Sequence, residues 1–480
     1  MLNSIQHFVK NGIPQLEESQ KNFMQDPAHL DQFVNQVKQM VLELGCHIVS
    51  ETLEECNLML EESIKRRIYW HIKDRTERTL LTSIGMVRFT HTRYTHKETK
   101  ESAYLLDRIL GLSAHTRLSM DAKACILEEA AQSSYRKAGE RLPESVSKET
   151  VMRSVHSLNI PKQEENRKEE KRQVKTLYVE ADEDPIALQF HEKKGDIKCW
   201  KGHKDNQQIV KMVYVHEGIE KKEKRNQLKQ PFFFGGIYPR KENEELWKEV
   251  DEYIKKTYDR EKIEEIRFQS DGGGWMKKGV ELLGGRFVLD GFHLRKYGKR
   301  MCRLAEKEEM EEELLTWIGR KQKGKVERWV KEAGGGLEER KQKKLEESWN
   351  YLKRNWKGVQ ERLEEKEENI GSSTEGHVSH ILSARMSSRP MGWSRKGADR
   401  LAQLRIYLKN GRDVEKLLLG QKEEGEEKEE EKRYFSVHEI LEWERRNQKK
   451  NGKYIEALQA KVSKQIGAKF YFHSAIAGIC

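Results

Sequence analysis

The order of strand-like and helix-like segments between residues 176 and 295 constrains the fold more than any other feature of this chain. Three strand-like segments come first, followed by an amphipathic helix, a fourth strand, a short helix and a fifth strand. In chain order they read TLYVEADEDPIALQF, QQIVKMVYVHEGI, PFFFGGIY, KENEELWKEVDEYIKKTYD, IEEIRFQSD, WMKKGVELLG and GRFVLDGFHL. Three consecutive strands can form an antiparallel meander, and the alternation that follows is typical of a sheet with helices packed on it. The order predicts an α/β core.

Ribonuclease-H-like nuclease cores use the same order of elements, but they need a further closing helix. Residues 296–370 are instead rich in Lys, Glu and Arg, with apolar residues at helical spacing, and predict an all-helical insertion. The four tryptophans of this stretch are expected to pack between its helices: Trp317, Trp329, Trp349 and Trp356. The predicted fold class is α/β, a ribonuclease-H-like catalytic core with a mixed five-stranded sheet. A mainly helical N-terminal DNA-binding region precedes it.

Composition shifts give the expected domain boundaries within the 480 residues. The predicted parts are an N-terminal helical region with a β-hairpin near 78–94 (1–130), a helix-turn-helix-like DNA-binding unit (131–160), a charged linker (161–175), the first part of the core (176–295), the helical insertion (296–370), the last part of the core (371–410) and a charged C-terminal region (411–480).

The segment SSYRKAGERLPESVSKETVMRSVHSL, residues 133–158, resembles a helix-turn-helix in its spacing. Ala138 would allow close packing of a short helix, a turn follows near Pro143, and Ser147 would cap the second helix. The second helix would then read a DNA groove. The alternative is a pair of ordinary packed helices. Basic residues expected at the DNA are Arg136, Lys137, Lys148 and Arg153.

The net charge of +11 favours a polyanionic partner, nucleic acid first. No apolar run approaches the roughly 18 residues that a membrane span needs, and the N-terminal residues lack a signal-peptide hydrophobic segment. The six cysteines form no CxxC pair, which argues against a zinc ribbon or a disulfide framework. The expectation is a cytoplasmic, nucleoid-associated protein with no membrane partner.

Three acidic residues stand where a nuclease core would need them. Asp182 ends the first strand, Asp271 ends the fourth strand in the sequence SDGGGW, and Glu375 opens a late helix. Phosphodiester cleavage commonly uses two divalent metal ions about 3.5–4 Å apart, and Mg²⁺ prefers carboxylate ligands. The glycines after Asp271 would let the backbone approach a DNA phosphate closely. For each acid taken alone, a cap or turn role is the competing interpretation.

Strand alternation separates Asp182 from its acidic neighbours. Leu177, Val179 and Ala181 would face the core, so Asp182 would point away from the core near the strand end. Asp184 shares that side if the strand continues, but Pro185 suggests that the strand bends or frays there. Asp182 is therefore favoured and Asp184 is an accessory candidate.

Other groups carry weaker signals. Asp290 and His293 are accessory candidates, because the histidine could touch the scissile phosphate or orient a carboxylate. His377 and His380 form an HxxH pair that lacks further zinc ligands at a usual spacing. A Ser-, Arg- and Pro-rich loop is expected either to contact phosphates and stack on an unpaired base, or to be a simple solvent-exposed loop. Its candidate residues are Arg385, Arg389, Trp393 and Arg395.

Several stretches resemble the signature blocks of ISLre-type bacterial insertion-sequence transposases, which belong to the Mutator-like DDE group. They are LYVEADEDPIALQ, SDGGGWMKKG, FVLDGFHLRKY and TEGHVSHILSARMSSRPMGWSRKGADRLAQLR, together with RTLLTSIGMVRFTHTRY, YLLDRILGL and SYRKAGERL nearer the N-terminus. The resemblance runs in order over roughly residues 60 to 410. Two blocks depart from the family pattern, with Pro185 in place of a histidine and Ser270-Asp271-Gly272-Gly273 in place of Gly-Asp-Gly-Ala.

The resemblance implies a ribonuclease-H-like core interrupted before its catalytic glutamate. Asp182, Asp271 and Glu375 would be the catalytic and metal-binding triad for Mg²⁺, with Mn²⁺ able to substitute, and Asp290 and His293 would match the Asp-x-x-His motif of the group. The implied activity is binding of terminal inverted repeats, phosphodiester hydrolysis and strand transfer, by a homo-oligomer on double-stranded DNA. The alternatives are a catalytically inactive or domesticated DNA-binding protein, and a nuclease or resolvase without strand transfer.

Overall fold

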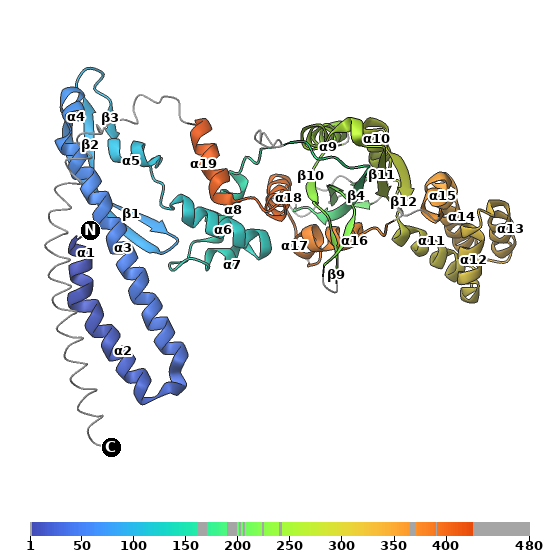
Figure 1. Ribbon diagram of the computed structural model, residues 1–480, viewed down its shortest axis with the longest axis horizontal. Helices are drawn as coiled ribbons and strands as arrows, with labels where there is room; N and C mark the ends of the chain where they lie inside the picture. The colour runs from blue at the N-terminus through green and yellow to red at the C-terminus, as the bar shows by residue number, and fades with distance from the viewer. Residues whose placement is uncertain are drawn as a thin grey trace. The chain divides into compact units, whose positions relative to one another are not determined.

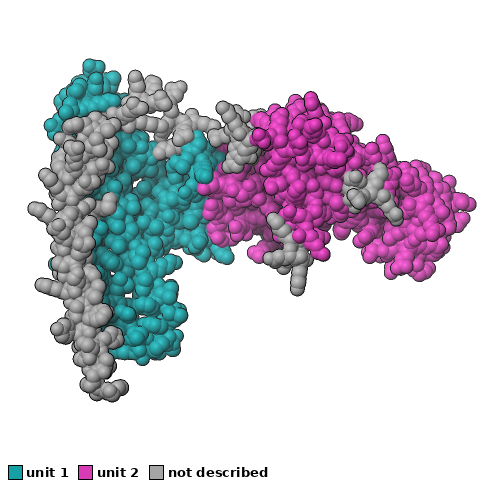
Figure 2. Space-filling model, in the orientation of Figure 1, with its two compact units in different colours: residues 1–126, 136–148, 415–480 teal, residues 127–135, 149–414 magenta. Residues whose placement is uncertain are grey.

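The computed structural model describes residues 2–161, 170–189, 199–200, 203–204, 207–222, 225–239, 242–364, 370–389 and 391–425. It divides into two compact units, residues 1–126, 136–148 and 415–480 as unit 1, and residues 127–135 and 149–414 as unit 2 (Figure 2). Most of the predicted linker and of the predicted C-terminal region, residues 162–169 and 426–480, lies outside the described residues. Within the described ranges, none of the helices is both long and apolar enough to cross a membrane.

Unit 1 contains a long β-hairpin packed against a 33-residue helix, α3 (Leu30–Glu62). Strands β1 (Trp70–Thr82) and β2 (Gly85–His96) pair antiparallel, so the hairpin expected near 78–94 begins earlier, at Trp70. Leu60 of α3 and Phe89 of β2 lie in the core of this unit. The other elements here are α1 (Leu2–His7), η1 (Phe8–Gly12), α2 (Ile13–Gln25), η2 (Pro27–His29), α4 (Ile64–Tyr69), β3 (Ser102–Tyr104) and α5 (Leu105–Leu110).

Two helices occupy the region of the predicted helix-turn-helix, α7 (Tyr135–Gly139) and α8 (Lys148–His156), after α6 (Met120–Gln132). The Gly139 carbonyl accepts a hydrogen bond from the Val146 N–H at 2.9 Å, and a Cβ at Gly139 would lie 2.2 Å from the Val146 carbonyl oxygen. The connection, residues 140–147, is longer than the roughly three- or four-residue turn of a helix-turn-helix. The helices lie where the sequence predicts them, with Pro143 in the connection and α8 beginning directly after Ser147, and the DNA-binding role stays a prediction.

Unit 2 is an α/β unit built on a mixed five-stranded sheet with the order β10-β7-β4-β11-β12. Strands β7 and β10 continue antiparallel from β4, whereas β11 and β12 run parallel to β4. Their bounds are β4 (Thr176–Ala187), β7 (Gln207–His216), β10 (Phe232–Gly236), β11 (Glu265–Ser270) and β12 (Arg286–Leu289). Two small hairpins interrupt this order, β5 (Cys199–Trp200) with β6 (His203–Lys204) and β8 (Ile219–Lys222) with β9 (Arg225–Leu228).

Helices cover both faces of this sheet (Figure 1). On one face, α9 (Asn243–Thr257) and α10 (Gly274–Leu283) pack on the apolar side of β4, as the alternation of Leu177, Val179 and Ala181 predicted. Trp247 of α9 is fully buried there. On the other face lie α16 (Thr374–Val378), η5 (Ser379–Ser383), α17 (Ala384–Met386) and α18 (Arg395–Lys409), followed in the chain by α19 (Val414–Gly425).

The stretch between β12 and residue 364 is helical. Its tryptophans Trp317, Trp329, Trp349 and Trp356 are all buried in one cluster, which confirms that they pack between helices. The first helix begins at Gly291 rather than at residue 296, because Asp290 caps its N-terminus directly after β12. The elements are α11 (Gly291–Leu304), η4 (Glu308–Met310), α12 (Glu311–Gly319), α13 (Lys323–Gly334), α14 (Glu339–Arg354) and α15 (Trp356–Leu363).

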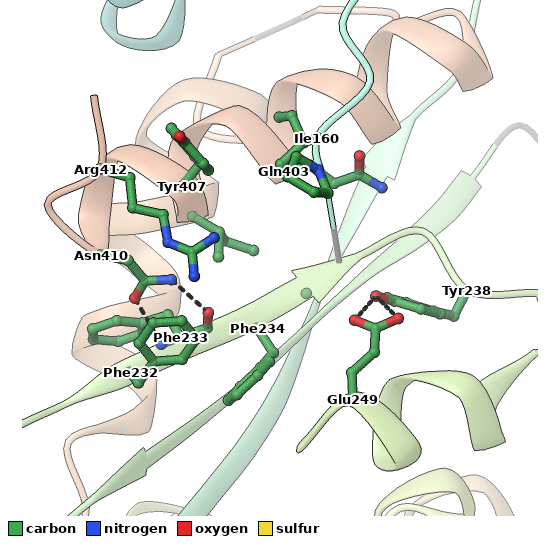
Figure 3. A pocket seen from close by; sticks show the side chains of 13 residues that line it. Ile160, Phe232, Phe233, Phe234, Tyr238, Glu249, Gln403, Tyr407, Asn410 and Arg412 are labelled. Atoms are coloured by element: carbon green, nitrogen blue, oxygen red, sulfur yellow. Dashed lines mark hydrogen bonds between the residues drawn. The ribbon is translucent and has the colours of Figure 1, made fainter. Parts of the chain in front are cut away.

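Strand β10 forms one edge of the sheet, and the side chain of Asn410, which directly follows α18, pairs with its backbone. The Asn410 amide accepts a hydrogen bond from the Phe233 N–H and donates one to the Phe233 carbonyl, each at 2.8 Å (Figure 3). An amide placed in this way takes the positions that a neighbouring strand would fill, so it protects the open edge from pairing with another chain. The cavity beside it is lined by Phe232, Phe234 and Tyr407 and contains none of the predicted site residues.

Candidate active site

The register of the parallel strands brings three aspartates to one edge of the sheet. Ala181 of β4 pairs with Ser270 of β11, and Ser270 pairs with Leu289 of β12. The next residues along the three strands are therefore Asp182, Asp271 and Asp290. The carboxyl ends of parallel strands are where ligands bind most often in open α/β sheets.

Asp182 is half-buried, and its Oδ1 accepts a hydrogen bond from the Glu183 N–H at 2.8 Å. The pKa of Asp182 is raised to about 7. Burial contributes most, the negative charges of Asp271 and Glu375 also raise it, and the Glu183 N–H and His293 act in the opposite direction. The structure therefore brings together all three predicted triad residues within electrostatic range. Glu375 is exposed at the start of α16.

The loop after Asp271 is held by the helical insertion. The Asp271 carbonyl accepts a hydrogen bond from the Tyr351 hydroxyl at 2.6 Å, and its Oδ1 accepts one from the Gly273 N–H at 2.8 Å. Gly272 has φ +82°, and a Cβ there would lie 2.6 Å from Asn355 Oδ1. Gly272 is thus required by backbone conformation and by contact with the insertion. Close approach of DNA, the reason expected from the sequence, is not needed to explain it.

A buried carboxylate that the sequence did not single out connects β4 to the segment that carries Glu375. Glu180 is completely buried, two residues before Asp182 on the same side of the strand. Its Oε2 accepts hydrogen bonds from Tyr214 Oη at 2.7 Å, Ser372 Oγ at 2.8 Å, the Ser373 N–H at 3.2 Å and the Thr374 hydroxyl.

The other oxygen of Glu180, Oε1, lies 3.1 Å from His216 Nε2. Burial acts to raise the pKa of Glu180, but the hydrogen bonds from His216, Thr374 and Tyr214 together with the His216 charge outweigh it and lower that pKa. The carboxylate is thereby kept ionised, and the residues just before Glu375 are fixed to the sheet. A signal for Glu180 existed in the sequence, since it lies within the largely apolar stretch 177–181, and a buried glutamate is uncommon unless it is paired.

Asp290 and His293 form a pair at the start of α11. Asp290 is buried, accepts a hydrogen bond from the Phe292 N–H at 3.2 Å, and lies 3.1 Å from His293 Nδ1. Burial acts to lower the pKa of His293, but its hydrogen bond with Asp290 and the charges of Asp290, Asp271 and Asp182 raise that pKa. The His293 imidazole is therefore protonated more readily than an ordinary histidine, because of its acidic neighbours.

Asp184 differs from Asp182 in its surroundings. It is buried, and the Ser387 hydroxyl lies within hydrogen-bond distance of both of its carboxylate oxygens, at 3.0 and 2.8 Å. Burial raises its pKa. The strand continues to Ala187, so the expected fraying at Pro185 was wrong. β11 pairs with β4 only as far as Ala181, and Pro185 therefore occupies a stretch with one open edge, where the missing N–H costs little.

The residues of the predicted basic loop fall into two groups, one buried and one exposed. Arg385 and Trp393 are buried, with the guanidinium carbon 4.9 Å from the indole ring centre, and Arg385 Nε donates to the Ala130 carbonyl at 3.2 Å. Their stacking partner is each other, so the expectation that they contact DNA is corrected. Arg389 and Arg395 are exposed, as are the four basic residues predicted further upstream, Arg136, Lys137, Lys148 and Arg153.

His377 and His380 do not act as a metal-binding pair in this arrangement. His377 Nδ1 lies 3.0 Å from the Ser373 carbonyl, and burial lowers the pKa of His377. More generally, in the described ranges no three His, Cys, Asp or Glu side chains are grouped as metal ligands. Asp182, Asp271 and Glu375 are therefore not arranged as a metal-binding group in this structure. The charges of Asp271 and Glu375 nevertheless help burial to raise the pKa of Asp182 to about 7, and carboxylates are the ligands that a hard divalent cation prefers.

A profile of UPF0236, an uncharacterised protein family, matches residues 23–423. The chain belongs to the UPF0236 family. A UPF0236 protein of Caldanaerobacter subterraneus subsp. tengcongensis, whose name joins eleven locus designations, is 32% identical over 429 residues, 88% of this chain and 86% of the relative. A second protein of that organism, whose name joins four designations, is 32% identical over 398 residues, 82% of this chain and 81% of the relative.

A UPF0236 protein of Streptococcus gallolyticus, named for the vanSb 3′ region, is 26% identical over 402 residues, 79% of this chain and 83% of the relative. The part of this UPF0236 chain that the family profile covers includes Asp182, Asp271 and Glu375. The family name carries no activity, and the transposase interpretation is therefore argued from the site.

Proposed function

We propose that this chain is a DDE-type DNA transposase that binds the terminal inverted repeats of an insertion sequence and catalyses metal-dependent phosphodiester hydrolysis and strand transfer. The observation that carries the proposal is the alignment of Asp182 and Asp271 on the adjacent parallel strands β4 and β11, each one residue beyond the last paired residues Ala181 and Ser270, with the charge of Glu375 acting on Asp182. A cluster of carboxylates on rigid elements is what phosphodiester cleavage by divalent metal ions needs.

The topology of unit 2 supports a ribonuclease-H-like core. Numbered in chain order without the small hairpins, its five strands have the order 3-2-1-4-5, with the first three antiparallel and the last two parallel to the first. The helical stretch Gly291–Leu363 lies between the fifth strand and Glu375. This arrangement agrees with a nuclease core interrupted before its last acid.

Each residue has a distinct part in the proposed reaction. Asp182, Asp271 and Glu375 would hold Mg²⁺ or Mn²⁺, which when bound stabilises charge on the phosphate and activates water or a 3′-hydroxyl. Glu180 keeps the segment before Glu375 on the sheet. His293, with its raised pKa, would when protonated place positive charge beside the acids and offset charge that develops on the phosphate.

The proposed partner is double-stranded DNA, both transposon ends and target, bound by a homo-oligomer in the nucleoid. The chain carries a net charge of +11, which favours association with a polyanion. The relatives whose names join eleven and four locus designations of one strain add support. Repeated copies in one genome are what an element that moves its own gene would produce.

The test is cleavage of a labelled duplex that carries the end of the element, with Mg²⁺ or Mn²⁺. Wild type should nick at the repeat boundary and join the freed 3′ end to a second duplex, whereas Asp182→Asn, Asp271→Asn and Glu375→Gln should bind the duplex without cutting it. Binding without any cutting by wild type would identify an inactive or domesticated DNA-binding protein. Cutting without joining would identify a nuclease or resolvase.

A further inference from the structure

A cavity adjoins the triad at Glu375, and most of its lining residues lie outside the triad. It has a volume of about 500 Å³ and is lined by the start of α11, the segment before α16, α16 itself, η5 and the end of α18. This volume is in the range of about 300–1,000 Å³ typical of sites for small organic groups. Its residues combine one aromatic ring with acids, hydroxyls, histidines and a lysine: Asp290, Phe292, Ser372, Ser373, Glu375, His377, His380 and Lys409.

Phe292 and Ile381 are apolar side chains of this cavity; Ile381 is buried, whereas 46% of the surface of Phe292 is exposed. It lies in the first turn of α11, where its own N–H donates to Asp290 Oδ1. The ring is thus carried on a fixed backbone two residues from the acid edge of the sheet. Lys296 Nζ lies 5.4 Å from the ring centre, so a cation lies beside the aromatic surface.

We propose that this cavity receives an unpaired nucleotide next to the scissile phosphate, with its base stacked on Phe292. The proposal rests on the proposed function, since it needs a phosphodiester at the triad. A phosphate at a divalent cation held by Asp182, Asp271 and Glu375 would have its attached nucleoside next to this cavity, because Glu375 also lines the cavity. A base still paired in a duplex cannot enter such a cavity, and it must therefore be unpaired first.

The lining matches the chemistry of a nucleotide. The flat ring offers a stacking surface that accepts any base, and Lys409 and Lys296 lie where they can meet phosphate oxygens. The hydroxyls of Ser372 and Ser373 border the same cavity. The site therefore selects for an unpaired end and makes no demand on base identity through the ring itself.

The experiment compares the affinity of the full chain for two labelled duplexes by fluorescence anisotropy, with Ca²⁺ in place of Mg²⁺ so that the carboxylates hold a divalent cation while cleavage is prevented. One duplex carries the element's end blunt, and the other carries the same end with three unpaired terminal nucleotides. Wild type should prefer the unpaired end by about tenfold or more, the range that stacking of a base on an aromatic ring gives. Phe292→Ala should lose this preference while keeping its affinity for the blunt duplex, and Phe292→Trp should retain it.

The matched control is Leu282→Ala on α10, an apolar side chain exposed to a similar extent, 50%, which should behave as wild type. If wild type binds both duplexes equally, or Phe292→Ala keeps the preference, the nucleotide site is refuted while the transposase proposal stands. If wild type binds neither duplex, the proposed function fails and the nucleotide site fails with it.

Discussion

Asp182→Asn should make the metal-free protein more stable at pH 8, and the gain follows from the raised pKa of this carboxyl. Burial and the neighbouring acids raise the pKa from 3.8 to about 7. A carboxyl whose pKa is higher in the folded state than in the unfolded state destabilises the folded state once pH exceeds the unfolded pKa. The cost grows from about pH 4 and is complete above pH 7. Below pH 4 both states are protonated and the cost disappears.

The magnitude follows from the size of the shift. A shift of about three pKa units at about 1.36 kcal/mol per unit gives an upper limit of about 4 kcal/mol at pH 8. Because Asp182 is only half-buried, solvent screening should reduce this to about 2 kcal/mol. At pH 5 the same reasoning leaves about 1 kcal/mol or less. Asparagine keeps the Oδ1 acceptor for the Glu183 N–H, so the change removes charge with little loss of hydrogen bonding.

The assay is urea unfolding in EDTA at pH 5 and pH 8, with Glu347→Gln as the control. Glu347 is an exposed acid of α14, and its removal should change the free energy of unfolding by less than about 0.5 kcal/mol. Equal stability of wild type and Asp182→Asn at pH 8 would refute the reasoning. If Asp182→Asn raised the free energy of unfolding by the same amount at both pH values, the gain would come from packing and not from the removal of charge.

Four further outcomes follow from the same contacts. At pH 8, Mg²⁺ should raise the melting temperature of wild type and leave that of Asp182→Asn unchanged; equal shifts would place the ion elsewhere. Glu180→Gln should lower the cleavage rate while retaining DNA binding, since it weakens the contacts that fix the segment before Glu375; an unchanged rate would refute that role. Gly272→Ala should lower the free energy of unfolding, measured with urea, by about 1–3 kcal/mol, because Gly272 has a positive φ and an added Cβ would meet Asn355. Gly274→Ala is the control, since the space around Gly274 is open and the free energy of unfolding should not fall. Arg385→Ala should lower the melting temperature and leave DNA affinity unchanged, because its guanidinium is buried; reduced affinity at equal stability would contradict this.

Much of the site could be read from local pattern. Asp182 and Asp271 were identifiable as acids that follow strand-like segments, and adjacent parallel strands bring such residues to one edge of a sheet, although β4 continues beyond Asp182 to Ala187. The tryptophans between 317 and 356 were identifiable from helical spacing. The strand positions of the acids and the packing of the tryptophans both depend on residues that are only a few positions apart in the chain.

The sequence misjudged features that depend on distant partners. Arg385 and Trp393 look like a basic aromatic loop, yet they stack on each other inside unit 2. Pro185 looks like a strand breaker, yet β4 continues through it. Strand β11 pairs with β4 only as far as Ala181, so on that edge of β4 no strand needs an N–H from Pro185. In both cases the deciding contact comes from another part of the chain, which local composition does not describe.

By itself, the sequence determined the alternation of strands and helices, the apolar side of β4, and the positions of the acids on β4 and directly after β11, because side-chain periodicity fixes these through steric and hydrophobic preferences within a few residues. The tertiary structure alone decided that Glu180 fixes the segment carrying Glu375, that the Tyr351 hydroxyl of the insertion binds the Asp271 carbonyl, and that Asn355 leaves no room for a side chain at position 272. These contacts join residues about 80 to 190 positions apart in the chain, and such pairings form only when the sheet has set the strands in register.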